Sequence, residues 1–363
     1  MADKEKIISF PHMGNYYIPI EFLINHTLNM KILTAPPITK RTLELGSKYS
    51  PDFVCVPFKY NLGNYIEALE KGANFLVQAG GGCRFGYYGE IQEQILRDLG
   101  YDFEFINILN ADDVSPFSVY GTFKKLNPRL TFGKFTYYFS LTLKMVEVID
   151  KIEMYIRENI GFEVKEGSFE KLLKDFLNIL KTIKSFNDLN KIYKKYNTIF
   201  RNIKVNKSDN PIKVGVVGEL YVIMEPFSNY FIEKELAKKG IQVTRFITVT
   251  YLFHKHKDEK QLIKSCGKYL KYAIGADGTD SVARTKQLAE AGYDGVIQVK
   301  PFGCTPEVNA MPILQNISND YKMPVLYFSF DSQTSETGIK TRVEAFHDML
   351  LMKREKDKWK SVI

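Results

Sequence analysis

Cysteine is scarce in this chain, with four residues in 363, and no CxxC pair is present. Four cysteines are too few for a disulfide scaffold, and in a reducing compartment such residues serve more often as metal ligands or catalytic thiols. No apolar run reaches the roughly 18 residues that a membrane span needs. The opening residues, MADKEKIISF, contain no apolar core of a signal peptide. We therefore expect a cytoplasmic protein with no membrane partner.

Signatures of nucleotide and nucleic-acid binding are also missing. There is no GxxxxGK[ST] motif for ATP, and VGVVGE at 214–219 does not complete the pattern GxGxxG. No zinc finger, aromatic RNA-recognition signature or basic arm argues for a nucleic-acid partner. The net charge of +8 gathers partly in Lys-rich helical stretches such as 171–196. These stretches predict a solvated helix face, and attraction to an acidic or phosphate-bearing partner is the alternative.

The order of apolar runs predicts an α/β fold with two Rossmann-like lobes, each built on a parallel sheet. Residues 1–110 alternate short strands with helices, one of which has Thr39 as its N-cap, and DFVCV at 52–56 is one of the predicted strands. Residues 111–209 carry long helical patterns and predict a helical linker or insert. Residues 210–363 return to the α/β pattern and predict the second lobe. We expect the last residues, KREKDKWKSVI, to be frayed.

Three cysteines lie at corresponding places in this pattern. Cys55 lies near the end of the run FVCV, Cys83 follows FLVQ through three glycines, and Cys304 follows VIQV through the residues KPFG. Each is predicted at or just past the carboxyl end of a strand, where open α/β sheets bind ligands. Each also leads into a helix, whose N-terminus favours the thiolate. Because two come from the first lobe and one from the second, we expect them to meet in the cleft between the lobes.

The residues alone leave several readings of this cysteine set open. Three thiolates are one short of the usual set for a 4Fe–4S cluster, and they also suit a zinc ion with an open position. Three buried, inert cysteines are a further alternative. Cys266 lies in LIKSCGKYL, a predicted helix, and we expect it to be structural. His254 and His256 could bind a metal as a pair, but a solvated loop is the simpler reading.

Several longer segments resemble a known family. They are FPHMGNYYIPIEFL, APPITKRTLELGSKYSPDFVCVPFKYNLGNYIEALEKGAN, QAGGGCRFGYYGEIQEQILRDLGYDFE, VGVVGELY, QVKPFGCTPE and DSQTSETGIKTRVEAF. Together they are similar to the acyl-CoA dehydratase activase-related proteins, relatives of the 2-hydroxyacyl-CoA dehydratase subunits and of benzoyl-CoA reductase. The likeness covers about 1–120 and 210–350 and is concentrated around the cysteines.

The resemblance implies a 4Fe–4S cluster with one unusual iron site, held by Cys55, Cys83 and Cys304. It also implies a homodimer or a related second subunit. In such dehydratases a separate ATP-hydrolysing activator delivers a low-potential electron, which passes to a 2-hydroxyacyl-CoA thioester. Some relatives join two cubanes into a double-cubane cluster and reduce small molecules. The chain could therefore be a lyase, an ATP-dependent reductase or a non-catalytic scaffold or electron-transfer subunit, and we expect the cluster to require anaerobic handling.

The residues around the cysteines suggest further roles. Arg84 follows Cys83 and could place a guanidinium beside an anionic cluster. Glu219 follows a glycine at a predicted strand end and could donate a proton to a leaving hydroxyl, although a helix N-cap contact is the alternative. A hydroxyl of Tyr87 or Tyr88 could donate to an iron-bound ligand. Two further charged residues flank Cys304, namely Lys300 and Glu307.

Overall fold

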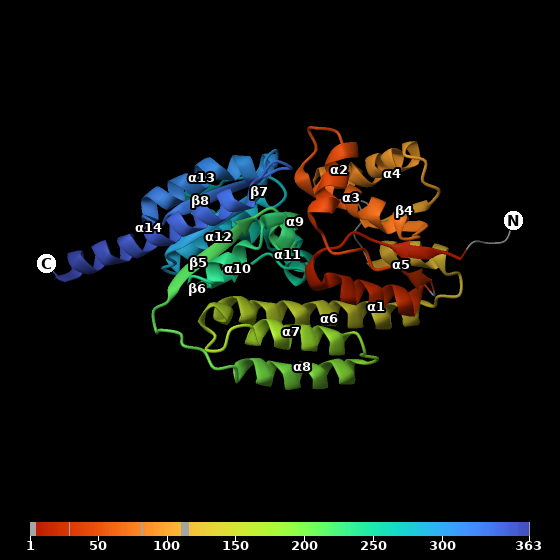
Figure 1. The fold of residues 1–363 in the computed structure, drawn as a ribbon, viewed down its shortest axis with the longest axis horizontal. Helices are drawn as coiled ribbons and strands as arrows, with labels where there is room; N and C mark the ends of the chain where they lie inside the picture. The colour runs from red at the N-terminus through yellow and green to blue at the C-terminus, as the bar shows by residue number, and fades with distance from the viewer. Residues whose placement is uncertain (1–4, 29, 81–82, 110–115, 363) are drawn as a thin grey trace. The chain divides into compact units, whose positions relative to one another are not determined.

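The computed structural model describes residues 5–28, 30–80, 83–109 and 116–362. The chain divides into two compact units. Unit 1 comprises Met1–Val148 and Leu177–Ile192, and unit 2 comprises Ile149–Phe176 and Tyr193–Ile363. Each unit contains a parallel four-stranded sheet with helices packed against it (Figure 1). The predicted α/β class with two parallel sheets is confirmed.

The sheet of unit 1 has the strand order β2-β1-β3-β4, and every pairing is parallel. Its inner strand β3 is buried at Phe75–Gln78 and begins with three apolar residues, as expected of a strand covered on both faces. The strands are β1 Ile7–Ser9, β2 Lys31–Ile32, β3 Phe75–Ala79 and β4 Glu104–Leu109. The helices are η1 Gly14–Tyr16, α1 Tyr17–Thr27, α2 Lys40–Tyr49, α3 Val56–Glu70, η2 Arg84–Tyr87, α4 Tyr88–Asp98 and α5 Pro116–Leu126.

The sheet of unit 2 repeats this topology with the order β6-β5-β7-β8. All seven residues of β7 are buried. The strands are β5 Ile212–Gly218, β6 Ile241–Arg245, β7 Gly295–Pro301 and β8 Val325–Phe330. The helices are α9 Leu220–Met224, η4 Pro226–Asn229, α10 Ile232–Ala237, α11 Val249–Cys266, η5 Gly267–Tyr269, α12 Gly278–Glu290, α13 Thr305–Tyr321 and α14 Glu336–Val362.

This shared strand order gives each sheet a topological switch point. The chain leaves β1 toward β2 on one side and returns to β3 on the other, so the direction of winding reverses between β1 and β3. The same reversal occurs between β5 and β7. In open parallel sheets, ligands bind beyond the carboxyl ends of the strands at such a switch point. The loops that follow β3 and β7 contain Cys83 and Cys304.

Long helices occupy most of 132–201, as the apolar spacing predicts. They are α6 Phe132–Asn159, η3 Ile160–Phe162, α7 Ser168–Leu180 and α8 Phe186–Arg201. Helices α6, α7 and α8 each contribute residues to both units. Within unit 2, α7 and α8 meet through the stacked rings of Phe169 and Phe200. The division of the chain at residues 110 and 209 stays a prediction.

The predicted strand at 52–56 is wrong. Helix α2 ends at Tyr49 and α3 begins at Val56, so Cys55 follows a turn and is the N-cap residue of α3. The reason is the close pairing of the two helices, since a Cβ at Gly46 would lie 1.7 Å from the Lys59 carbonyl oxygen. A two-helix crossover from β2 to β3 leaves no place for a strand between the helices. The predicted N-cap Thr39 is confirmed, because its side chain accepts from the backbone N–H of Thr42.

The expectation of a frayed C-terminus is also wrong. Helix α14 continues to Val362, beyond the strands of its unit (Figure 1). Arg354 anchors this helix, because its guanidinium donates to the Asp294 carboxylate and, at 2.7 Å, to the carbonyl of Pro211. A basic end that pairs with a fixed acid can therefore remain helical. None of the helices in the described ranges is long and apolar enough to cross a bilayer.

Candidate functional site

Cys304 lies at the switch point of unit 2. It follows β7 after a tight turn, in which its N–H donates to the Pro301 carbonyl, and it is the N-cap residue of α13. Proline at the start of α13 fixes the helical backbone where no N–H donor is needed. The thiol is partly buried, and the backbone N–H of Glu307 hydrogen-bonds to it. The predicted position of Cys304 at a strand end and a helix start is confirmed.

Glu219 lies at the carboxyl end of β5, beside β7. Its N–H donates to the carbonyl of Val299 at 3.0 Å, and its side chain accepts from the N–H groups of Tyr221 and Val222 at 3.1 and 2.9 Å. Gly218 allows this close approach, since it has φ +140° and a Cβ there would lie 1.8 Å from the Val299 oxygen. Glu219 therefore makes the N-cap contact that was the alternative to a proton-donor role. The N-cap contact is compatible with a proton-donor role, because burial and the nearby Asp277 raise the pKa of Glu219 to about 7.

Glu307 is a second buried acid, in the first turn of α13. Its carboxylate accepts from the Ser281 hydroxyl, which lies 2.9 and 3.0 Å from its two oxygens, and from the Gln298 amide at 2.6 Å. The side chain has no exposed surface. Burial and the charge of Asp277 raise the pKa of Glu307 to about 8. The sequence marks Glu307 only as a neighbour of Cys304, whereas the fold makes it the most enclosed acid of this edge.

Asp277 completes an acidic group around Cys304. It is the N-cap residue of α12 and accepts from the N–H of Leu220 at 3.0 Å. Burial raises the pKa of the Cys304 thiol, and the charges of Glu219, Glu307 and Asp277 raise it further, while the Glu307 N–H acts in the opposite direction. The thiolate form of Cys304 therefore needs a compensating positive charge.

Lys300, at the end of β7, is a cation near Cys304 and Glu307. Its side chain is 3% exposed, and its ammonium donates to the Ser329 hydroxyl at 2.8 Å on the neighbouring strand β8. Burial lowers the pKa of Lys300, whereas the charges of Cys304 and Glu307 act to raise it. A lysine held this way is a point charge that favours anions beside it.

In unit 1, the side chain of Cys55 contacts a neighbouring helix. Its Sγ atom lies 2.8 Å from the hydroxyl of Tyr88, the first residue of α4. The same hydroxyl hydrogen-bonds to the backbone N–H of Cys55. Burial raises the pKa of Tyr88 above its ordinary value, and the charges of Cys55 and Cys83 add to this effect. Both thiols of unit 1 therefore lie near enough to Tyr88 to influence its hydroxyl.

Cys83 precedes the short helix η2 and is exposed. Its carbonyl accepts from the N–H of Gly86 at 3.0 Å, which closes the turn that leads into α4. The side chain of Arg84 lies outside the described part of the structure, so the predicted role of Arg84 beside a cluster stays a prediction. Tyr87 is 74% exposed, in contrast to the buried Tyr88. The sequence alone gives Tyr87 and Tyr88 the same role, whereas the fold exposes the first and buries the second.

Cys266 differs from the other three cysteines. It is the last residue of α11, has no exposed surface and packs in the apolar core of unit 2. Burial raises the pKa of its thiol.

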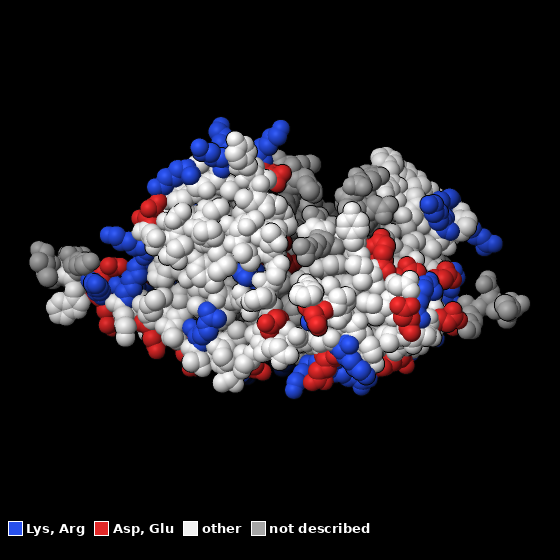
Figure 2. Space-filling view, turned by 90° about the horizontal axis from the view of Figure 1, so that it is seen from above, with Lys and Arg blue, Asp and Glu red and all other residues white. Residues whose placement is uncertain are grey.

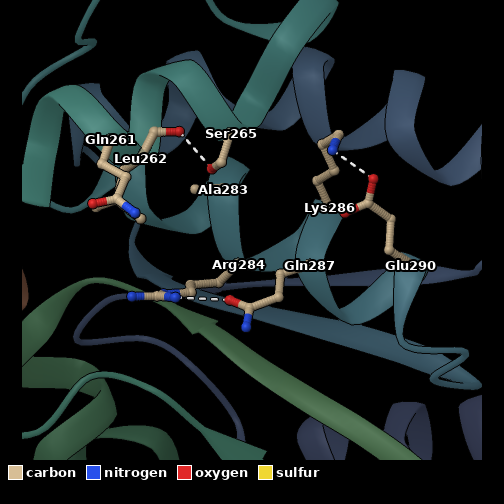
Figure 3. Close-up of a pocket in the computed structure, with 8 residues that line it drawn as sticks. All are labelled: Gln261, Leu262, Ser265, Ala283, Arg284, Lys286, Gln287 and Glu290. Carbon is tan, nitrogen blue, oxygen red and sulfur yellow. Dashed lines mark hydrogen bonds and ion pairs between the residues drawn. The ribbon is translucent and has the colours of Figure 1, made fainter.

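A cavity of about 330 Å³ lies between α11 and α12. Its cations already have partners, since Arg284 donates to Gln287 and Lys286 pairs with Glu290 (Figure 3). We find no reactive group in it.

Other sequence-predicted features carry less chemistry. The side chains of His254 and His256 lie outside the described residues. On the face drawn in Figure 2, Lys and Arg are scattered among Asp and Glu and form no single basic patch. The lysines of the stretch 171–196 are all exposed, which confirms the predicted solvated helix face.

The metal-binding capacity of each unit is limited. Within the ranges that the structure describes, no three His, Cys, Asp or Glu side chains are grouped so that they could hold a metal ion. Unit 1 offers the thiols of Cys55 and Cys83, and unit 2 offers that of Cys304 at its switch point. In unit 2, backbone N–H groups already engage the carboxylates of Glu219 and Asp277. The partly accessible thiols suit a soft metal centre, but neither unit alone supplies a complete set.

Sequence reasoning placed Lys300 and Glu307 beside Cys304 but missed Asp277, Ser281 and Gln298. Asp277 stands in GADGTDSV, where an aspartate before a Gly-Thr pair is a recognisable helix-start signal. Ser281 and Gln298 give no such signal, because their role depends on α12 and β7 lying beside α13. The gathering of Glu219, Asp277 and Glu307 around one thiol depends on tertiary structure alone.

Comparison with known families adds one finding. Residues 173–350, just under half of the chain, match the family of the 2-hydroxyglutaryl-CoA dehydratase D-component. The match includes the whole sheet of unit 2, with Glu219, Asp277 and Cys304. No curated protein matches the chain. The match supports a relationship with the 2-hydroxyacyl-CoA dehydratase-like superfamily.

Proposed function

We propose that this chain is an iron–sulfur subunit of the 2-hydroxyacyl-CoA dehydratase type. In this proposal Cys55, Cys83 and Cys304 are the thiolate ligands of one 4Fe–4S cluster. Low-potential electrons come from a separate ATP-hydrolysing activator, and a second copy or a related chain completes the assembly. The segments around the cysteines resemble the activase-related proteins of this superfamily.

The observation that carries the proposal is the matching position of Cys83 and Cys304. Each follows the inner strand of a parallel sheet, beside a switch point, and each leads into a helix. Cys55 starts a helix of the same unit as Cys83. Cys266, by contrast, is sealed in a core. The family match over residues 173–350 supports a dehydratase-like relationship for the part of the chain that contains Cys304.

The acids around Cys304 supply proton chemistry in this proposal. A 4Fe–4S cluster supplies one-electron transfer, and an iron without a protein thiolate can bind an oxygen of a substrate. Glu219, with a pKa near 7, retains a proton for much of the time at neutral pH. It would give that proton to the hydroxyl of a substrate that has taken up the electron supplied by the cluster. The carbon–oxygen bond would break with its electron pair leaving on water, and Glu219 would regain a proton from solvent. Glu307, whose pKa is about 8, is mostly protonated at neutral pH and therefore adds little negative charge beside Glu219.

Anaerobic purification tests the proposal directly. We expect a brown protein with iron and acid-labile sulfide each near about four per chain, and an electron paramagnetic resonance signal after reduction by a low-potential chemical reductant. The protein should bleach in air, because one iron lacks a protein thiolate. Stoichiometric zinc without labile sulfide would contradict the proposal. Full iron content with no reducible signal would contradict the redox role.

A further inference from the structure

We propose that the Tyr88 hydroxyl donates a hydrogen bond to the Sγ atom of Cys55 and thereby sets the reduction potential of the cluster that Cys55 helps to hold. This inference rests on the proposed function. It makes Tyr88 a positioning residue that acts through the ligand rather than on a substrate.

The direction of the hydrogen bond follows from the geometry. The hydroxyl oxygen lies 2.8 Å from Sγ and is also bonded to the backbone N–H of Cys55. An N–H group can only donate, so it occupies a lone pair of the hydroxyl oxygen and leaves the O–H proton for another acceptor. A metal-bound thiolate has no proton and is an acceptor. The O–H proton of Tyr88 therefore points to the sulfur of Cys55.

The ring of Tyr88 is fixed in place. Its side chain is 4% exposed, and it packs edge-to-face on Phe58, with centroids 4.8 Å apart and ring planes at 88°. Phe58 is in α3, the helix that Cys55 begins, and its carbonyl accepts from the Gln92 side chain of α4 at 3.2 Å. Helices α3 and α4 thus hold the donor and the acceptor in one relative position, and the hydrogen bond needs no ordering step.

A hydrogen bond to a ligand sulfur has a defined effect on redox properties. It withdraws electron density from the thiolate, which stabilises the reduced cluster more than the oxidised one and raises the reduction potential. A residue that only filled space would leave the potential unchanged when its hydroxyl is removed. Tyr87 is the matched control, because it is adjacent in sequence, has the same hydroxyl and is exposed.

The test is a graded series at position 88 in the anaerobically purified chain. We expect Tyr88→Phe to keep its iron and sulfide while its midpoint potential becomes more negative and its Fe–Sγ stretching frequency changes in resonance Raman spectra. Replacing Tyr88 by 3-fluorotyrosine, a stronger donor, should move the potential the other way. Tyr87→Phe should match the parent. An intact cluster with the same potential across the series would overturn the inference.

If the Tyr88→Phe variant loses its cluster, a second measurement tests the same hydrogen bond. In the cluster-free chain, the infrared S–H stretching band of Cys55, assigned by its loss in Cys55→Ala, should shift when the Tyr88 hydroxyl is removed. An unshifted band would overturn the inference. A parent chain without iron or sulfide would contradict the proposed function itself, whereas a parent with a cluster and an insensitive potential would contradict only the role of Tyr88.

Discussion

Asp277 and Cys55 occupy equivalent places in the two units, and each turns its side chain to a neighbouring element. Cys55 is the N-cap residue of α3, the helix before β3, and Asp277 is that of α12, the helix before β7. Neither side chain caps its own helix. Cys55 contacts the Tyr88 hydroxyl at 2.8 Å, and Asp277 accepts from the Leu220 N–H at 3.0 Å.

One topology therefore presents two kinds of chemistry. At its switch point unit 1 has thiols at both the helix start and the loop after the inner strand, at Cys55 and Cys83. Unit 2 keeps a thiol only in the loop, at Cys304, and has a carboxylate at the helix start. Burial raises the pKa values of Glu219 and Glu307, and this difference between the units raises them further, since Asp277 adds a negative charge beside both of them.

Removing the charge of Asp277 should lower the pKa of Glu219. In Asp277→Asn, the side-chain oxygen can still accept from the Leu220 N–H, but the like charge that raises the pKa of Glu219 is gone. Carbon-13 spectra of the side-chain carboxyls in the cluster-free chain, assigned with Glu219→Gln, should show Glu219 titrating below about pH 7. A titration that is unchanged in Asp277→Asn would show that burial alone sets the pKa.

The acids of unit 2 should make the cluster-free chain less stable as the pH rises. The pKa of Glu307 is about 8 in the folded chain, against 4.5 as its ordinary value. Between these values the folded state binds more protons than the unfolded state, so its contribution is complete below about pH 4.5 and is lost as the pH rises through about 8. Urea denaturation at about pH 5 and about pH 8 measures this loss, of which we expect Glu307 alone to account for about 3 kcal/mol.

Glu307→Gln should remove the share of that pH dependence that Glu307 contributes and leave the share of Glu219, because glutamine keeps the hydrogen bonds of the site but does not titrate. The exposed Glu355 provides the control, and Glu355→Gln should behave like the parent. If Glu307→Gln and the parent lost the same stability between the two pH values, another group would be responsible.

Gly218 should tolerate no side chain. Its φ is +140° and an added Cβ would lie 1.8 Å from the Val299 oxygen, so Gly218→Ala must separate β5 from β7. We expect a loss of about 3 kcal/mol or more in the free energy of unfolding. Gly240→Ala is the control, because φ there is +66° with no atom within 4 Å, and it should cost only about 1–2 kcal/mol. Equal losses in the two variants would exclude the steric account.

Local patterns predicted much of the fold. The apolar runs before Cys83 and Cys304 form the inner strands β3 and β7, and the Thr39 cap lies where a threonine before a helical pattern belongs. The same logic failed at 52–56, where an apolar run between two prolines resembles a strand. The pairing of α2 with α3 decides that segment, and it depends on contacts such as Gly46 with Lys59.

The sequence predicted the positions of Cys304 and Glu219 at strand ends, but not the surroundings of Glu307. Cys304 lies where a strand gives way to a helix, and that boundary has a sequence signal. Glu307 lies one turn into α13, as many acidic residues do, and only its contacts with Ser281 and Gln298 distinguish it. Those contacts join α12, β7 and α13, whose proximity results from the sheet order rather than from any local pattern.

The most direct test of the ligand set is the iron content of four single variants, purified side by side without oxygen. Cys55→Ser, Cys83→Ser and Cys304→Ser should each lose most of the iron and labile sulfide, because each removes a thiolate bond. Cys266→Ser should keep the iron content of the parent, since Cys266 is sealed in the core of unit 2. Equal iron in all four variants, whether all retained or all lost, would contradict the assignment of Cys55, Cys83 and Cys304 as the ligands.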